Sequence, residues 1–150
     1  MEPVSRRASP EETFRREVGD AFAFLIERAG FCGPESTENR TGGFQVRFHR
    51  PELHIEVNYW PGREPTVSTM VERGGTDDTT ARYAYLECLY VAAGCGPAAH
   101  VPGSAPTPRA MLKRVHEHAA ALHRLLPILL TPQAEELFVR CWLRRQLPEG

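Results

Sequence analysis

Hydrophobic and polar residues alternate along residues 44–72 in three short runs, and this alternation predicts three β-strands. The runs cover residues 44–49, 53–60 and 66–72. Pro51 suits the second position of a type I turn, so residues 50–53 are expected to close the first hairpin. Paired residue numbers in that hairpin then sum to 103, and a slip of one residue would mix apolar and polar side chains on each face. The register is therefore well specified.

This register assigns a partner to each residue of the first hairpin. On the apolar face, the expected pairs are Phe44 with Tyr59, Val46 with Val57 and Phe48 with Ile55. On the polar face, they are Gln45 with Asn58, Arg47 with Glu56 and His49 with His54. Pairing Tyr59 with Val67 in the third strand also brings Glu72 beside His54 and Met70 beside Glu56. The apolar face requires helices to cover it.

Helical periodicity surrounds the three strands. Ser9, Pro10 and Glu12 form a capping box that starts a helix ending at Gly30, and apolar spacing from Tyr83 to Ala93 predicts a second helix closed by Gly94. The polar segment 32–43 can supply a fourth, short and irregular edge strand. Residues 109–126 and 132–147 predict two more helices, bent or ended by Pro127 and joined as a hairpin. The sequence predicts an α+β fold: an N-terminal helix, a three- to four-stranded antiparallel meander, a second helix and a C-terminal helical hairpin.

Length and composition indicate one domain. The 150 residues would divide into a helix–meander–helix core at 11–93, a Pro/Gly-rich linker at 94–108 and the hairpin at 109–147. The formal net charge of −1 provides no general attraction to nucleic acid or membranes, so neither partner is expected. The four cysteines form no CxxC, and no stretch resembles a secretory signal or a membrane span. We therefore expect a cytoplasmic protein with reduced cysteines, in which Cys88 and Cys141 are small core residues.

Two groups of side chains could carry chemistry. His49, His54 and Glu72 lie in one row across the expected sheet and are suitable ligand types for zinc or another divalent metal, although a solvated polar face with two histidines near a hairpin end is the favoured explanation. His116, His118 and His123 lack the i, i+4 spacing of a helical metal site, which favours a place beside a helix–helix contact.

Other motifs of catalysis are weak. Cys95 follows a helix C-terminus, which disfavours a thiolate, so its glycine neighbours are better explained as a helix stop. No phosphate-binding loop and no serine elbow occurs in the sequence. No catalytic residue and no cofactor is therefore expected, which favours a protein that is not an enzyme.

The order of elements is similar to that of a known group of proteins. A helix containing Phe24-Leu25 and ending in Gly30-Phe31 precedes strands that read Val46-Arg-Phe and Leu53-His-Ile-Glu-Val-Asn-Tyr59. This pattern, over residues 11–93, resembles the small bacterial α+β immunity proteins of toxin systems. The resemblance implies a protein that binds and blocks a protein partner such as a toxin. It implies no catalytic residues, because that group has no common catalytic set.

Three functions follow as hypotheses. The first is a non-catalytic, immunity-like protein-binding domain that inhibits or regulates a protein partner, with contacts on the polar sheet face at Arg47, His49, His54, Glu56, Asn58 and Trp60. The second is a metal-binding module or metal-dependent enzyme that uses His49, His54 and Glu72. The third is a structural subunit or homodimer that associates through the C-terminal hairpin at Leu122, Leu126, Phe138 and Trp142.

Overall fold

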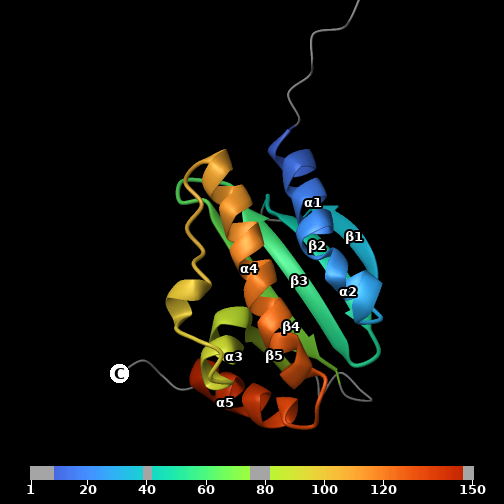
Figure 1. The fold of residues 1–150 in the computed structure, drawn as a ribbon. Coiled ribbons are helices and arrows are strands. Elements are labelled where there is room, and N and C mark those ends of the chain that lie inside the picture. Colours follow the sequence, from blue (N-terminus) through green and yellow to red (C-terminus); the bar gives the residue numbers. More distant parts are fainter. Residues whose placement is uncertain (1–8, 39–41, 75–81, 147–150) are drawn as a thin grey trace, which may run out of the picture.

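The chain folds as an α+β protein around one antiparallel sheet (Figure 1). The structure is a computed structural model that describes residues 9–38, 42–74 and 82–146, with side chains described as far as residue 141. The five strands lie in chain order across the sheet. They are β1 (Cys32–Glu38), β2 (Phe44–Arg50), β3 (Leu53–Trp60), β4 (Thr66–Arg73) and β5 (Arg82–Tyr85).

The central register is the one that the alternation predicts. Phe48 pairs with Ile55 and Arg47 with Glu56 across β2 and β3, and Tyr59 pairs with Val67 across β3 and β4. Burial of alternate residues explains this agreement, because side chains along β4 switch between half-buried and buried at each step from Thr66 to Glu72. The predicted meander is confirmed in both strand pairing and facing.

The structure adds two edge strands to this meander. β1 is the irregular fourth strand that the polar segment can supply, with a register shift between Cys32 and Glu35. β5 is a correction, because its residues were expected to lie in or before the second helix. Tyr83 and Tyr85 instead alternate with the buried Ala84 in a strand paired with Met70–Arg73. That pairing satisfies backbone groups of β4 that a helix would have left at an open edge.

The N-terminal helix begins as expected and then breaks. Ser9 caps α1 (Pro10–Ala21) by accepting a hydrogen bond of 3.1 Å from the backbone N–H of Glu12, and Pro10 occupies the first turn. A second helix, α2 (Ala23–Arg28), follows at a bend around Phe22, so the single helix predicted over this stretch is two. Gly30 closes α2 in a left-handed conformation with φ of 74°. The turn brings the N–H of Phe31 to the carbonyl of Leu25 at 3.0 Å.

We expect Ser9→Ala to lower the free energy of unfolding by about 1 kcal/mol, because the N–H of Glu12 loses its acceptor. Ser9→Asp keeps a hydrogen-bond acceptor at the cap. Its free energy of unfolding should stay within roughly a few tenths of a kcal/mol of the original value, because serine and aspartate are similarly effective as cap residues. Urea unfolding of the three proteins measures this difference. Equal losses in both variants would contradict a capping role for Ser9.

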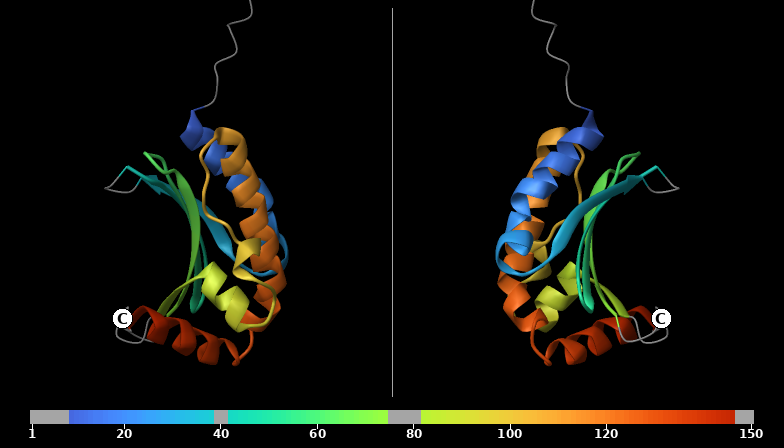
Figure 2. Two further views of the ribbon diagram at one scale, coloured as in Figure 1. Left: turned by 90° about the vertical axis from the view of Figure 1, so that its left-hand side faces the viewer. Right: turned by 90° about the vertical axis from the view of Figure 1, so that its right-hand side faces the viewer.

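The core lies between the sheet and the helices α1, α2 and α4 (Pro108–Leu129), which cover one of its faces (Figure 2). Phe14, Val18 and Phe22 from the N-terminal helices and Phe48 and Ile55 from the sheet are completely buried. The rings of Phe22 and Phe48 stack with centroids 6.0 Å apart. Burial of these large apolar side chains, each contributing roughly 1.5–3 kcal/mol, holds the layers together.

The Pro/Gly-rich linker packs on the sheet as an ordered segment. After α3 (Leu86–Ala92), it forms the short 3-10 helix η2 (Ala98–His100) and then buries Val101 and Ala105. The N–H of Val67 donates to the carbonyl of Gly103 at 2.8 Å, and the N–H of Ala105 donates to the carbonyl of Pro65 at 2.8 Å. The linker thereby takes the place of a neighbouring strand beside the start of β4, where β5 does not reach.

The last two helices do not form the expected hairpin. α4 packs against α1 and α3, whereas α5 (Ala134–Gln146) crosses the end of the molecule and packs on β5 and α3 (Figure 1). The Thr131-Pro132 turn after α4 redirects the chain. Leu122 and Phe138 are completely buried and Leu126 is 7% exposed, so they form core contacts within the chain. These three side chains are therefore not available at the surface for the predicted dimer contact, and the side chain of Trp142 lies outside the described part.

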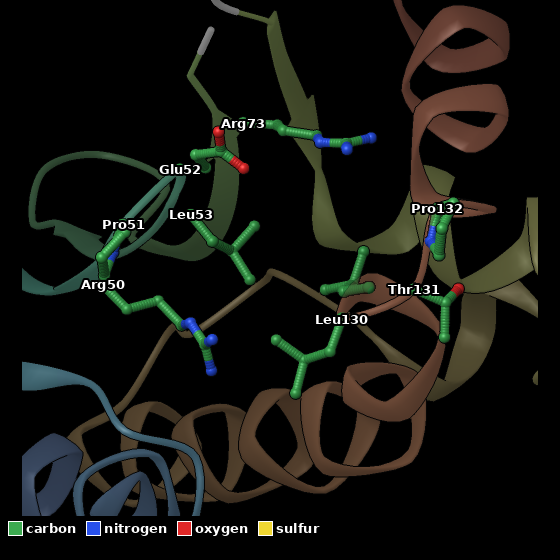
Figure 3. Close-up of a pocket in the computed structure, with 9 residues that line it drawn as sticks. Arg50, Pro51, Glu52, Leu53, Arg73, Leu130, Thr131 and Pro132 are labelled. Carbon is green, nitrogen blue, oxygen red and sulfur yellow. The ribbon is translucent and has the colours of Figure 1, made fainter. Parts of the chain in front are cut away.

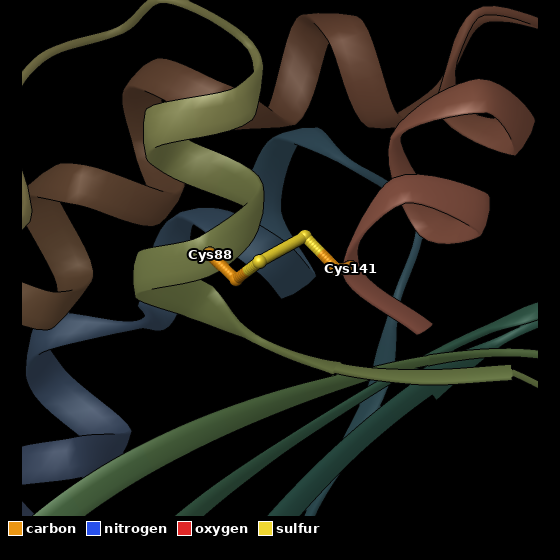
Figure 4. The surroundings of a disulfide bond; sticks show 2 residues. All are labelled: Cys88 and Cys141. Atoms are coloured by element: carbon orange, nitrogen blue, oxygen red, sulfur yellow. A yellow bond between two sulfur atoms is a disulfide. The ribbon is translucent and has the colours of Figure 1, made fainter. Parts of the chain in front are cut away.

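A disulfide joins Cys88 of α3 to Cys141 of α5, with Cα atoms 6.0 Å apart (Figure 4). Cys141 is buried at 2% exposure, as predicted, whereas Cys88 is only partly buried against the core, and the reduced state predicted for both is wrong. The cause of this error is that 53 residues separate the two cysteines, so no local motif indicates that they meet. Cys32 and Cys95 are free thiols.

Candidate functional site

One face of the sheet is left uncovered by the described helices. Figure 2 shows the sheet bowed, with its concave side turned away from α1 and α4, and α5 crossing below its lower end. We call this side the open face. It carries the side chains that alternate with the core residues of β2, β3, β4 and β5. They are Gln45, Arg47, His49, His54, Glu56, Asn58, Trp60, Thr66, Ser68, Met70, Glu72, Tyr83 and Tyr85, joined from β1 by Glu35.

An ion pair lies at the centre of the open face. Nε of Arg47 lies 3.3 Å from Oε1 of Glu56, as the predicted cross-strand pair requires. Another nitrogen of the same guanidinium lies 3.5 Å from Nδ1 of His54. Next to it, Nδ1 of His49 lies 3.6 Å from Oε1 of Glu35 on β1. The strands thus gather acidic, basic and imidazole groups within one surface.

The Glu56 carboxyl is the most shielded charge in this group. Its side chain is only 17% exposed, and this burial raises its pKa above the ordinary value. Arg47 and, to a smaller extent, His54 act in the opposite direction, whereas the charge of Glu72 raises the pKa further. The guanidinium of Arg47 therefore offsets only part of the effect that burial has on the pKa of the Glu56 carboxyl.

Five of the six predicted contact residues are accessible on this face, and one is not. Arg47, His49, His54, Glu56 and Trp60 are all partly exposed. Asn58 is only 3% exposed, and its amide oxygen accepts a hydrogen bond of 3.1 Å from Gln45. Asn58 is therefore a structural residue of the sheet, and its assignment as a partner contact is corrected.

The predicted metal ligands occupy their expected row but do not converge. His49 pairs with His54, and His54 pairs with Glu72, on adjacent strands. The two imidazole rings lie 6.1 Å apart between centroids, and Nδ1 of His54 lies close to the cationic Arg47. Within residues 9–38, 42–74 and 82–146, no three His, Cys, Asp or Glu side chains are grouped so that they could hold a metal ion. The geometry thus gives no support to the metal hypothesis.

Two of the three α4 histidines lie at the contact with the N-terminal helices, as predicted. Nε2 of His116 lies 3.1 Å from the carboxylate of Glu17 on α1. The ring of His123 meets the ring of Phe24 edge to face, with centroids 5.0 Å apart. Both residues therefore connect α4 to its neighbours.

The third, His118, is completely buried between the sheet and the linker. Its Nδ1 lies 2.9 Å from the hydroxyl of Thr69, and its Nε2 lies 2.7 Å from the carbonyl of Pro102. A carbonyl only accepts, so Nε2 carries the proton and Nδ1 accepts from Thr69. Burial lowers the pKa of His118, which keeps the imidazole neutral. The sequence signal for this contact is Thr69 itself, a hydroxyl on an otherwise apolar strand face.

A cavity of about 280 Å³ lies at one end of the sheet, between the β2–β3 turn and the end of α4 (Figure 3). Its walls include Arg50, Arg73 and the apolar Leu130. Arg50 donates a hydrogen bond of 2.6 Å to the carbonyl of Ala29, and Arg73 pairs with Glu135 of α5 at 2.9 Å. Both cations thus hold neighbouring elements in place, which makes this cavity a weaker candidate than the open face.

Cys95 and its surroundings form no nucleophilic site. His100, five residues further on, has its Nδ1 2.9 Å from the hydroxyl of Tyr90, which is a contact within the α3–η2 corner. Gly94 adopts a left-handed conformation with φ of 75° and ends α3, in agreement with the predicted helix stop. The residues near Cys95 therefore have structural explanations.

Known proteins do not indicate which of these features is functional. No helix in the described part of the chain has the length and apolar character needed to cross a membrane. The open face carries more exposed charged and aromatic side chains than the cavity at the end of the sheet does. It is therefore the candidate functional site. Comparisons of the chain with protein-family models, with curated proteins and with solved structures gave no match.

Proposed function

We propose that this protein is a non-catalytic protein-binding domain that blocks or regulates a protein partner, in the manner of an immunity protein, and that the open face is its binding surface. The observation that carries this proposal is the concave sheet face, which the described helices leave uncovered (Figure 2). Antiparallel sheets often have one face in water, so exposure alone is no argument for binding. The composition of the face supplies the further support.

The side chains on the open face are of the types that dominate protein interfaces. Trp60 lies at one end of β3, and Tyr83 and Tyr85 on β5 are 39% and 36% exposed. Tryptophan, tyrosine and arginine are enriched among the residues that contribute most to binding. The Arg47–Glu56 ion pair lies in the same cross-strand row as Met70 and Tyr85, and its side chains are only partly exposed. Rigid strands hold all these groups, which reduces the entropy lost on association.

Exchanging the two charges of the central pair tests this surface. In the double variant Arg47→Glu with Glu56→Arg, the pair can still form, so the fold should persist while the surface presents reversed charges. We expect binding of a native partner, captured from cells of the host, to weaken at least about tenfold, equivalent to 1.4 kcal/mol. Quantitative mass spectrometry of the captured proteins measures the change.

A matched exchange on α5 provides the control. Arg140 pairs with Glu136 at 3.1 Å, and both side chains are largely exposed. The double variant Glu136→Arg with Arg140→Glu should capture the partner as the original protein does. Thermal unfolding shows that both exchanged proteins are folded. If exchange of the Arg47–Glu56 charges left every captured partner at its original level, the open face would not be the binding surface.

A further inference from the structure

Charge on the open face is unevenly distributed. Among its described residues, Glu35, Glu56 and Glu72 are acidic, whereas Arg47 is the single guanidinium. The formal excess is thus two negative charges with the histidines neutral, although the whole chain carries a net charge of only −1. The acidic excess is therefore a property of this face and not of the protein surface in general.

Two of the three carboxylates form no ion pair with a guanidinium or ammonium group among the described residues. Glu72 has no ion-pair partner among the described residues, and it lies diagonally across from Glu56 on the neighbouring strand, where its charge raises the pKa of Glu56. Glu35 lies opposite Arg47 in the β1–β2 pairing, but among the described residues its only ion-pair contact is with the imidazole of His49, at 3.6 Å. A cation from outside that approached Glu56 and Glu72 would relieve the repulsion between them, because a nearby opposite charge favours the ionised carboxylate.

The shape and sign of the face exclude two kinds of partner. A second copy of the chain that docked through its own open face would present the same concave, acidic surface, so the two faces would neither fit nor attract. Nucleic acid carries one negative charge for each phosphate and would be repelled. A convex, positively charged protein element satisfies both conditions.

We propose that the partner presents a basic convex element, such as a helix with lysine or arginine side chains that reach Glu56 and Glu72, to the concave open face. This inference rests on the proposed function and adds the chemistry of the partner. The apolar side chains of such an element would contact the exposed rings of Tyr83 and Tyr85 beside Glu72 and Met70. Complementary charge of this kind contributes mainly to the association rate and to the choice of partner.

Two designed peptides test the charge preference directly. The first is an 18-residue amphipathic helix of leucine and lysine, and the second is the same helix with glutamate in place of each lysine. Fluorescence anisotropy measures their binding to the protein. We expect the lysine peptide to bind at least tenfold more tightly than the glutamate peptide. Its affinity should fall as salt is raised, because salt screens exposed charges over about 8–10 Å at 0.1–0.15 M.

Variants locate the binding on the protein. Glu56→Gln with Glu72→Gln keeps the shape of both side chains and removes their charge, and it should weaken binding of the lysine peptide at least fivefold. Glu136→Gln removes an exposed carboxylate of α5 outside the open face and should leave binding unchanged. Equal binding of the two peptides, or lysine-peptide binding that survives the double variant, would overturn the inference.

The capture experiment on the Arg47–Glu56 exchange separates this inference from the function on which it rests. If exchange abolishes capture but the peptides show no charge preference, the open face binds a partner that is not basic, and only the present inference fails. If the peptides behave as expected but capture survives the exchange, the acidic face attracts cations without being the native binding surface, and the proposed function fails.

Discussion

Reducing the Cys88–Cys141 disulfide should lower the free energy of unfolding by about 2–4 kcal/mol. The bond closes a loop across 53 positions of sequence, and breaking it restores the conformational freedom of that loop to the unfolded chain. The folded state keeps other contacts of α5, among them the pairing of Glu135 with Arg73 and Arg82. We therefore expect a less stable protein that still folds. Urea unfolding with and without a thiol reductant measures the loss.

Single cysteine variants distinguish the disulfide from other effects of the reductant. Cys141→Ser should be destabilised without reductant, and adding reductant should change its stability little. Cys32→Ser replaces an exposed free thiol and should match the original protein under both conditions. Should the original protein unfold at the same urea concentration with and without reductant, the proposed contribution of the disulfide would be wrong.

Replacement of His118 by alanine should cost about 3 kcal/mol of unfolding free energy. The substitution removes a completely buried ring and leaves the Thr69 hydroxyl and the Pro102 carbonyl without their partner. Thr69→Val, which removes only the hydroxyl at similar volume, should cost about 1–2 kcal/mol. His116→Ala, on the exposed side of the same helix, should cost less than about 1 kcal/mol. Similar losses from His116→Ala and His118→Ala would contradict the buried role of His118.

The same histidine should make stability depend on pH. Because burial lowers its pKa in the folded protein, the unfolded chain, with a histidine pKa near about 6.5, binds the proton more readily. The contribution of the neutral ring is therefore complete above this pH and is lost as pH falls below about 6.5. The raised pKa values of Glu56 and Glu87 act in the opposite direction at lower pH. Subtracting the pH profile of His118→Ala from that of the original protein isolates the histidine, and identical profiles would refute the assignment.

The sequence alone predicts the centre of the fold because its information is local there. In residues 44–72, alternation sets both the strands and the facing of each side chain, and the turn at Pro51 sets the register. The open face follows from the same alternation, which is why five of the six predicted contacts are accessible. Asn58 is the exception, because alternation sets the face on which it lies but not its burial to 3% exposure beside Gln45.

The features that could not be predicted depend on contacts between distant segments. β5 is short and contains two tyrosines, so its residues suit a helix start as well as a strand until the edge of β4 requires a partner. The disulfide and the direction of α5 arise only when α3 and β5 are in place. The contact between His118 and Thr69 joins residues 49 positions apart, and neither residue alone identifies the other.

The ordered linker has a consequence for how this chain can be divided. Gly103 and Ala105 pair with the backbone beside Val67, so the first 93 residues do not complete their own sheet. A shorter protein that ended at Ala93 would expose the N–H of Val67 and the carbonyl of Pro65 along a strand edge, which is a template for pairing with other chains. The helix–meander–helix half is therefore not a minimal unit. Any shorter relative that lacks the second half would need its own cover for this edge.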